Sequence, residues 1–136
     1  MLQRDNHSFA RSMYLLGQIG AIVCHERGPK ADTSILTHMA SHPAEGFWLA
    51  MSDINGARTP TRGGARALLQ WKRKEIARLA RMLPHPLPES ASAQTQMPFW
   101  AGYCQYWDDV LKAHVDTEPG RSARQTGDQQ PRHVNA

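Results

Sequence analysis

Two histidines and a glutamate are the first residues in this sequence whose spacing suggests chemistry. His38 and His42 are one helical turn apart and Glu45 follows three residues later, a pattern that resembles a metal site. However, Met39 stands where zincin hydrolysis requires a glutamate, and Pro43 ends a helix at the second histidine. We therefore expect surface histidines and neither a metal nor a cofactor. The alternative is a small metal-dependent enzyme that uses His38, His42 and Glu45, and stoichiometric zinc in the purified protein would support it.

The remaining reactive residues favour packing over catalysis. Cys24 and Cys104 are isolated in apolar, helix-like surroundings, which predicts two small buried side chains in a reducing compartment and no disulfide. Asp108 and Asp109 are adjacent, so on a helix they point about 100° apart and make a poor acid/base pair. No phosphate loop, nucleophile elbow or dinucleotide fingerprint occurs. The sequence thus predicts that the protein is not an enzyme and takes no small-molecule substrate.

Charge is the more informative feature. From residue 58 to residue 81 the chain has eight basic residues and one acid, Glu75, whereas the whole chain has a net charge of only +4. Solvated helix faces usually mix both signs, so this segment predicts sequence-independent binding to nucleic acid. A solvated face and docking to an acidic protein are the two alternatives. The candidate binding residues are Arg58, Arg62, Arg66, Arg73, Lys74, Arg78 and Arg81.

The elements that must position these cations are helices, because apolar residues recur at steps of three and four. Helices are expected over 8–26, 33–39, 43–54, 65–83 and 95–115. No convincing strand pattern occurs. Two glycines inside the first helix, Gly17 and Gly20, are expected to allow another helix to approach closely.

The helix over 65–83 should separate apolar from basic residues. Its inward face is predicted to carry Leu69, Ile76, Leu79 and Leu83, and its opposite face the cations. At a rise of about 1.5 Å per residue, the cations would extend over about 22 Å, enough to follow several phosphates of a strand. In the last helix we expect Trp100, Tyr103 and Trp107 to face the core; whether Tyr106 packs or binds stays open.

Together these patterns predict an all-α protein, a single small helical bundle of four to five helices over residues 1–115. Residues 116–136 lack core-forming side chains and are expected to be a disordered C-terminal tail. Because no apolar run is long enough for a membrane span and no secretory signal is apparent at the N-terminus, we expect a cytoplasmic protein with no membrane partner.

Three segments, in order, resemble the C-terminal helical region of the type I-C CRISPR Cascade large subunit, which is also produced as a separate small subunit. They read Tyr14-Leu15-Leu16-Gly17-Gln18-Ile19-Gly20-Ala21-Ile22-Val23, then Ala40-Ser41-His42-Pro43 leading into Phe47-Trp48-Leu49, and Phe99-Trp100-Ala101-Gly102-Tyr103. The resemblance covers about residues 10–113, with departures from the family pattern at 30–37 and 104–107.

The resemblance implies a non-catalytic small subunit of a CRISPR RNA-guided surveillance (Cascade) complex. Its partners would be the Cascade backbone and large subunits, crRNA and target DNA, together with further copies of itself. It would stabilise the R-loop and the displaced strand, while base pairing reads the sequence. A different hypothesis is a regulatory or inhibitory phage or plasmid protein that docks onto a nucleic-acid machine through an acidic protein surface.

Overall fold

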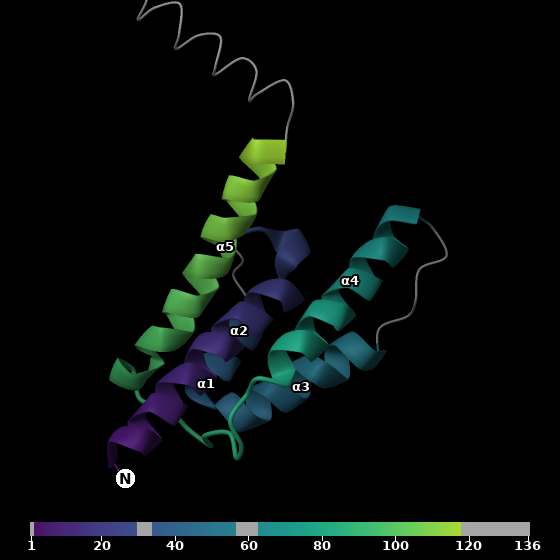
Figure 1. Ribbon diagram of the computed structural model, residues 1–136. Helices are drawn as coiled ribbons and strands as arrows, with labels where there is room; N and C mark the ends of the chain where they lie inside the picture. The colour runs from purple at the N-terminus through teal and green to yellow at the C-terminus, as the bar shows by residue number, and fades with distance from the viewer. Residues whose placement is uncertain (1, 30–33, 57–62, 118–136) are drawn as a thin grey trace, which may run out of the picture.

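The structure is a computed structural model that describes residues 2–29, 34–56 and 63–117. The described residues form helices only and contain no strand (Figure 1). This confirms the prediction of a small all-α bundle. The elements are α1 (Leu2–Val23), η1 (His25–Arg27), α2 (Ser34–Ser41), α3 (Pro43–Gly56), α4 (Gly63–Ala80), η2 (Gln94–Gln96) and α5 (Met97–Thr117), η denoting a 3-10 helix.

Helix α1 is the centre of the bundle and contacts each of the other four α-helices. Met13, Leu16, Ile19 and Ile22 are buried completely or almost so. In the last part of α1, every residue from 19 to 23 is buried, whichever side of the helix it lies on, and so is residue 24 just beyond the helix. A helix that is apolar all round has to be enclosed by other elements, which explains why the rest of the fold surrounds this one.

Helices α1 and α5 approach so closely that glycine is required at the contact. A Cβ atom on Gly17 would overlap the carbonyl oxygen of Phe99, and one on Gly102 would overlap the carbonyl oxygen of Tyr14. The helices therefore meet backbone to backbone at two reciprocal points. Gly20, one turn further along α1, gives similar room to the side chain of Leu36 from α2. The prediction that both glycines of α1 allow close approach is confirmed.

Helix α4 packs on α1 through the face that its sequence predicts. Ile76 and Leu79 are buried, as is Leu83 just beyond the helix, while Leu69 is half-buried. The Pro-rich segment that follows returns across the start of α3, where the carbonyl oxygen of Pro88 accepts a hydrogen bond of 2.9 Å from the amide of Ala44. This bond satisfies one of the amides that a helix start leaves without a partner.

Helix boundaries differ from the prediction by a few residues, as is usual for frayed ends. α1 starts at Leu2, earlier than predicted, and a 3-10 turn replaces the predicted last turn. α4 starts at Gly63 and ends at Ala80, although the amide of Arg81 still donates to the Ala77 carbonyl at 3.2 Å. α5 continues to Thr117, and the rest of the predicted tail lies outside the described residues. No helix in the described ranges has the length and apolar character that crossing a bilayer requires.

Replacing Gly17 or Gly102 by alanine should destabilise the protein by about 3 kcal/mol, because the atoms that the new methyl group meets belong to a backbone that cannot move aside. Denaturant unfolding followed by circular dichroism measures this. The matched control is Gly64→Ala, in a position of α4 with nothing within 4 Å of the added methyl group. It should be neutral or stabilise by up to about 1 kcal/mol. Equal effects of the three substitutions would contradict the close contact.

Candidate nucleic-acid interface

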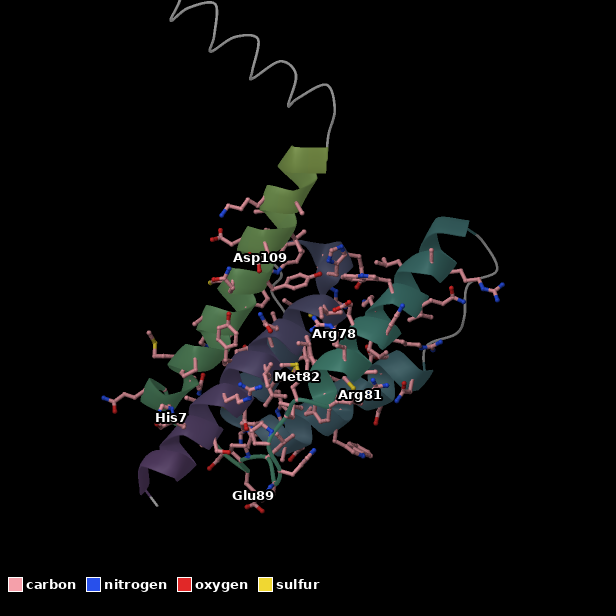
Figure 2. The ribbon with its side chains drawn as sticks, viewed as in Figure 1. His7, Arg78, Arg81, Met82, Glu89 and Asp109 are labelled. Carbon is pink, nitrogen blue, oxygen red and sulfur yellow. The ribbon has the colours of Figure 1, made fainter. Side chains whose placement is uncertain are left out.

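The exposed side of α4 and its last turn carry a row of cations, which we call the basic ridge: Arg66, Lys74, Arg78 and Arg81. All four side chains are exposed, and Figure 2 shows Arg78 and Arg81 at the C-terminal part of α4. The ridge exists because Ile76 and Leu79 turn the opposite face of the helix toward α1. At about 1.5 Å per residue, the part of the ridge within α4, from Arg66 to Arg78, corresponds to about 18 Å along the helix axis.

The cations of the basic ridge differ in whether they already have a partner. In the described part of the chain, Lys74 and Arg81 have no carboxylate within ion-pair distance. Arg78 donates from Nε and Nη2 to one carboxylate oxygen of Glu75, at 3.0 and 2.9 Å. A pair between exposed neighbours on one helix contributes little free energy, so a phosphate can compete for Arg78. Arg66 likewise has no ion-pair partner among the described residues, so Arg66, Lys74 and Arg81 are the strongest candidates for phosphate contacts.

Three predicted site residues do not belong to the basic ridge as the structure describes it. Arg73 was expected on the outward face but is half-buried, and its Nη2 donates to the carbonyl oxygen of Ile54 at 3.1 Å. That carbonyl lies in the last turn of α3, where helical partners are lacking. Arg73 therefore joins α4 to α3, and the prediction that it lies on the outward face is wrong. Arg58 and Arg62 lie outside the described residues.

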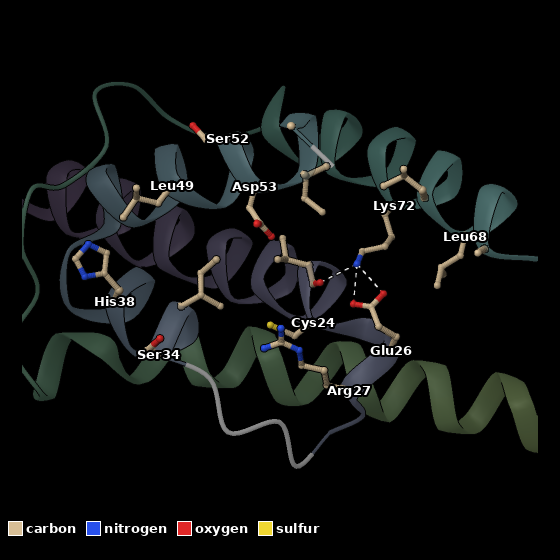
Figure 3. A pocket seen from close by; sticks show the side chains of 16 residues that line it. Cys24, Glu26, Arg27, Ser34, His38, Leu49, Ser52, Asp53, Leu68 and Lys72 are labelled. Atoms are coloured by element: carbon tan, nitrogen blue, oxygen red, sulfur yellow. Dashed lines mark hydrogen bonds and ion pairs between the residues drawn. The ribbon is translucent and has the colours of Figure 1, made fainter. Parts of the chain in front are cut away.

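Lys72 is a cation of the same segment that the structure buries, with 5 % of its surface exposed. Its Nζ donates to the carbonyl oxygen of Val23 at 2.8 Å and to both carboxylate oxygens of Glu26 at 2.9 Å (Figure 3). The ammonium group thereby caps the C-terminal end of α1. In the sequence analysis, Lys72 was included among the eight basic residues of the segment and was not distinguished from the exposed ones. Its spacing of four residues from Ile76 was the available signal, because that spacing places it on the inward face.

A groove of about 1200 Å³ lies between α4 on one side and α2 and α3 on the other (Figure 3). The charged side chains that line it include two acids, Glu26 and Asp53, and two bases, Arg27 and Lys72. Because acids and bases are balanced there, the groove does not extend the positive field of the basic ridge. Apolar side chains line the rest of it, namely Val23, Ile35, Leu49, Ile54, Leu68 and Leu69.

An aromatic cluster joins η1, α4 and α5 beside the basic ridge. The ring of His25 stacks on Trp107, with centroids 5.5 Å apart and planes at 12°, and its centroid is 5.2 Å from that of Trp71. The hydroxyl of Tyr106 and Nδ1 of His25 are 2.7 Å apart. Tyr106, which the sequence left open, is therefore part of this cluster. Trp71 was not singled out from the sequence.

Burial shifts both titratable members of the aromatic cluster toward their neutral forms. It lowers the pKa of His25, an effect that nearby Lys72 reinforces and Glu26 opposes. Burial, together with the charge of Glu75, raises the pKa of Tyr106 to about 12. With His25 neutral, its Nδ1 and the Tyr106 hydroxyl share one hydrogen bond, in which the imidazole tautomer decides which group donates. The cluster is thus a neutral, hydrogen-bonded unit at ordinary pH.

The inward aromatic residues of α5 follow the prediction, whereas one cysteine does not. Tyr103 and Trp107 are buried and Trp100 is half-buried. Neither Cys24 nor Cys104 forms a disulfide, and Cys24 is buried as predicted. The expectation that Cys104 is buried is wrong, because it lies one residue beyond Tyr103 and so points away from the stripe that faces α1.

The histidine pair does not assemble a metal centre in the structure. Nε2 of His38 lies 3.1 Å from a carboxylate oxygen of Glu45, and the ring of His42 stacks on that of His38 at 5.1 Å. In the part of the chain that the structure describes, no group of three or more histidine, cysteine or acidic side chains is placed to hold a metal ion.

Searches of protein-family models, curated proteins and solved structures found no match to this chain.

Protonation of His25 should destabilise the fold. The unfolded residue binds a proton below about pH 6.5, whereas burial makes the folded residue bind it only at lower pH. Over this range the unfolded state binds more protons, so the free energy of unfolding must fall as the pH is lowered. His25→Phe keeps an aromatic ring and should reduce the fall in stability between pH 7 and pH 5, measured by denaturant unfolding. His42→Phe, at an exposed histidine, is the control and should leave the fall unchanged.

Proposed function

We propose that this protein is a non-catalytic small subunit of a CRISPR RNA-guided surveillance (Cascade) complex. It holds nucleic acid without sequence preference on the basic ridge and so stabilises the R-loop and the displaced strand. The observation that carries the nucleic-acid part is the exposure of Lys74 and Arg81, which have no carboxylate partner among the described residues. The segments that resemble the type I-C large subunit support the assignment to Cascade.

The chemistry of the basic ridge suits phosphates better than bases. Its members are charged side chains on the outside of a helix whose rotation the core fixes, and contacts of this kind set position and affinity but carry no sequence information. In an RNA-guided complex, base pairing between guide and target does the reading and the protein supplies positive charge. A small helical subunit without a catalytic centre is sufficient for that role.

A second surface, on α3, supports the proposal that this protein assembles with other proteins. Trp48 and Leu49, adjacent on α3, have 65 % and 41 % of their surface exposed. Exposed tryptophan is enriched at protein interfaces, so this part of α3 is where we place the contact with the backbone and large subunits. The same feature fits the alternative, a regulatory or inhibitory protein of a phage or plasmid, and the experiments below separate the two.

Removing two of the ridge cations that have no ion-pair partner among the described residues should weaken binding to single-stranded DNA. Each phosphate contact contributes about 0.7 to the slope of log affinity against log salt, which amounts to roughly fivefold in affinity at about 0.1 M salt. Lys74→Ala/Arg81→Ala should therefore bind about 25-fold more weakly and reduce the slope by about 1.4. Fluorescence anisotropy with a labelled oligonucleotide over a series of salt concentrations measures both quantities.

A charge-matched control removes two exposed cations elsewhere, by Arg11→Ala/Lys112→Ala, and should leave affinity and slope nearly unchanged. Glu75→Gln should have the opposite effect, because it eliminates the acid that pairs with Arg78, and binding should become about fivefold tighter. If both double variants weaken binding equally, net charge and not the basic ridge is responsible. If the ridge variant binds an acidic protein less tightly but DNA unchanged, the regulatory alternative is correct.

The assignment to Cascade predicts specific partners. The tagged chain, purified from its native cells, should retain Cascade backbone and large subunits and crRNA, identified by mass spectrometry and RNA sequencing. The variant Trp48→Ala/Leu49→Ala should lose the protein partners but keep the salt-dependent DNA binding of the isolated chain. CRISPR effector genes beside its own gene are expected. Recovery of a different nucleic-acid machine, with no crRNA, would refute the assignment to Cascade.

A further inference from the structure

Trp71 is an exposed aromatic residue of α4 beside the basic ridge. It precedes Lys74 by three residues and Arg78 by seven, so all three lie on one side of α4. At about 1.5 Å per residue they lie within about 11 Å along the helix axis. Of its surface, 38 % is exposed, so part of the indole is accessible to a ligand.

The aromatic cluster supports Trp71 from below. The centroid of the His25 ring is 5.2 Å from that of the Trp71 indole, with an interplanar angle of 60°, and the His25 ring is in turn stacked with Trp107 at 5.5 Å. The contact between His25 and the Tyr106 hydroxyl, at 2.7 Å, holds the imidazole in turn. An indole supported in this way loses little conformational entropy when a second ring stacks on its exposed side.

We propose that Trp71 is a stacking platform for one unpaired base of a single strand whose phosphates lie on the basic ridge. This inference rests on the proposed function and names its ligand class: single-stranded nucleic acid, and not a duplex. Alternation of an aromatic ring with cations is the arrangement by which single strands are bound without sequence preference. In a duplex the bases are already stacked on one another and offer no free face to Trp71.

The test compares Trp71→Ala with the wild-type chain on three ligands: oligothymidylate, a strand of the same length with abasic sites, and a duplex. The variant should bind oligothymidylate about tenfold more weakly, with an unchanged salt slope because no charge is removed. Binding to the abasic strand and the duplex should be the same for both proteins. Trp71→Phe should restore most of the loss. Leu111→Ala removes a more exposed large apolar side chain, on α5 and outside the basic ridge, and should have no effect.

The outcomes separate this inference from the proposed function. If Lys74→Ala/Arg81→Ala weakens binding and Trp71→Ala does not, the basic ridge binds phosphates and the stacking inference is wrong. If Trp71→Ala lowers the affinity for oligothymidylate and for the abasic strand equally, the inference is also wrong. The indole would then affect binding by stabilising the fold and not by stacking on a base. If neither variant changes binding of single strands, the proposed function fails as well.

Discussion

The backbone contact between α1 and α5 is the constraint on which the rest of the structure depends. Gly17 and Gly102 bring the main chains of the two longest helices together, with no side chain between them. The separation of these helices decides how far Phe99 reaches into the core, where it is completely buried. A wider separation would leave empty space around that ring, and interiors packed like organic crystals tolerate few such voids.

Once α1 is fixed, Lys72 acts together with the buried Ile76 and Leu79 to set the rotation of α4 about its own axis. Its ammonium group has to reach the Val23 carbonyl and Glu26 at the end of α1. Residues two positions apart on a helix point in nearly opposite directions, so burying Lys72 turns Lys74 to the outside. A rotation that exposed Lys72 would bury Lys74 without a partner, at a cost of several kcal/mol. A buried cation therefore keeps the exposed cations of the basic ridge in place.

The sequence predicts the helices well because their apolar residues repeat at steps of three and four, and a stripe of this kind can be buried only on one side of a helix. Contacts between distant segments were harder to predict. The burial of Lys72 needs an acceptor 46 residues away in the chain, and Arg73 leaves the exposed face only because the end of α3 happens to lie beside it. The aromatic cluster escaped prediction for the same reason, since it combines side chains from three elements.

Binding of nucleic acid without sequence preference asks less of side-chain geometry than of charge separation. Cations that lie near the chain's own carboxylates pair with them, as Lys72 does with Glu26, and are then less available to phosphates. The fold keeps Arg81 apart from the acids of α5, such as Asp109, because α1 lies between α4 and α5 (Figures 1 and 2). The central helix thus has an electrostatic role besides packing. It keeps the charges of one face from cancelling those of another, which is what lets a chain of modest net charge present a positive surface.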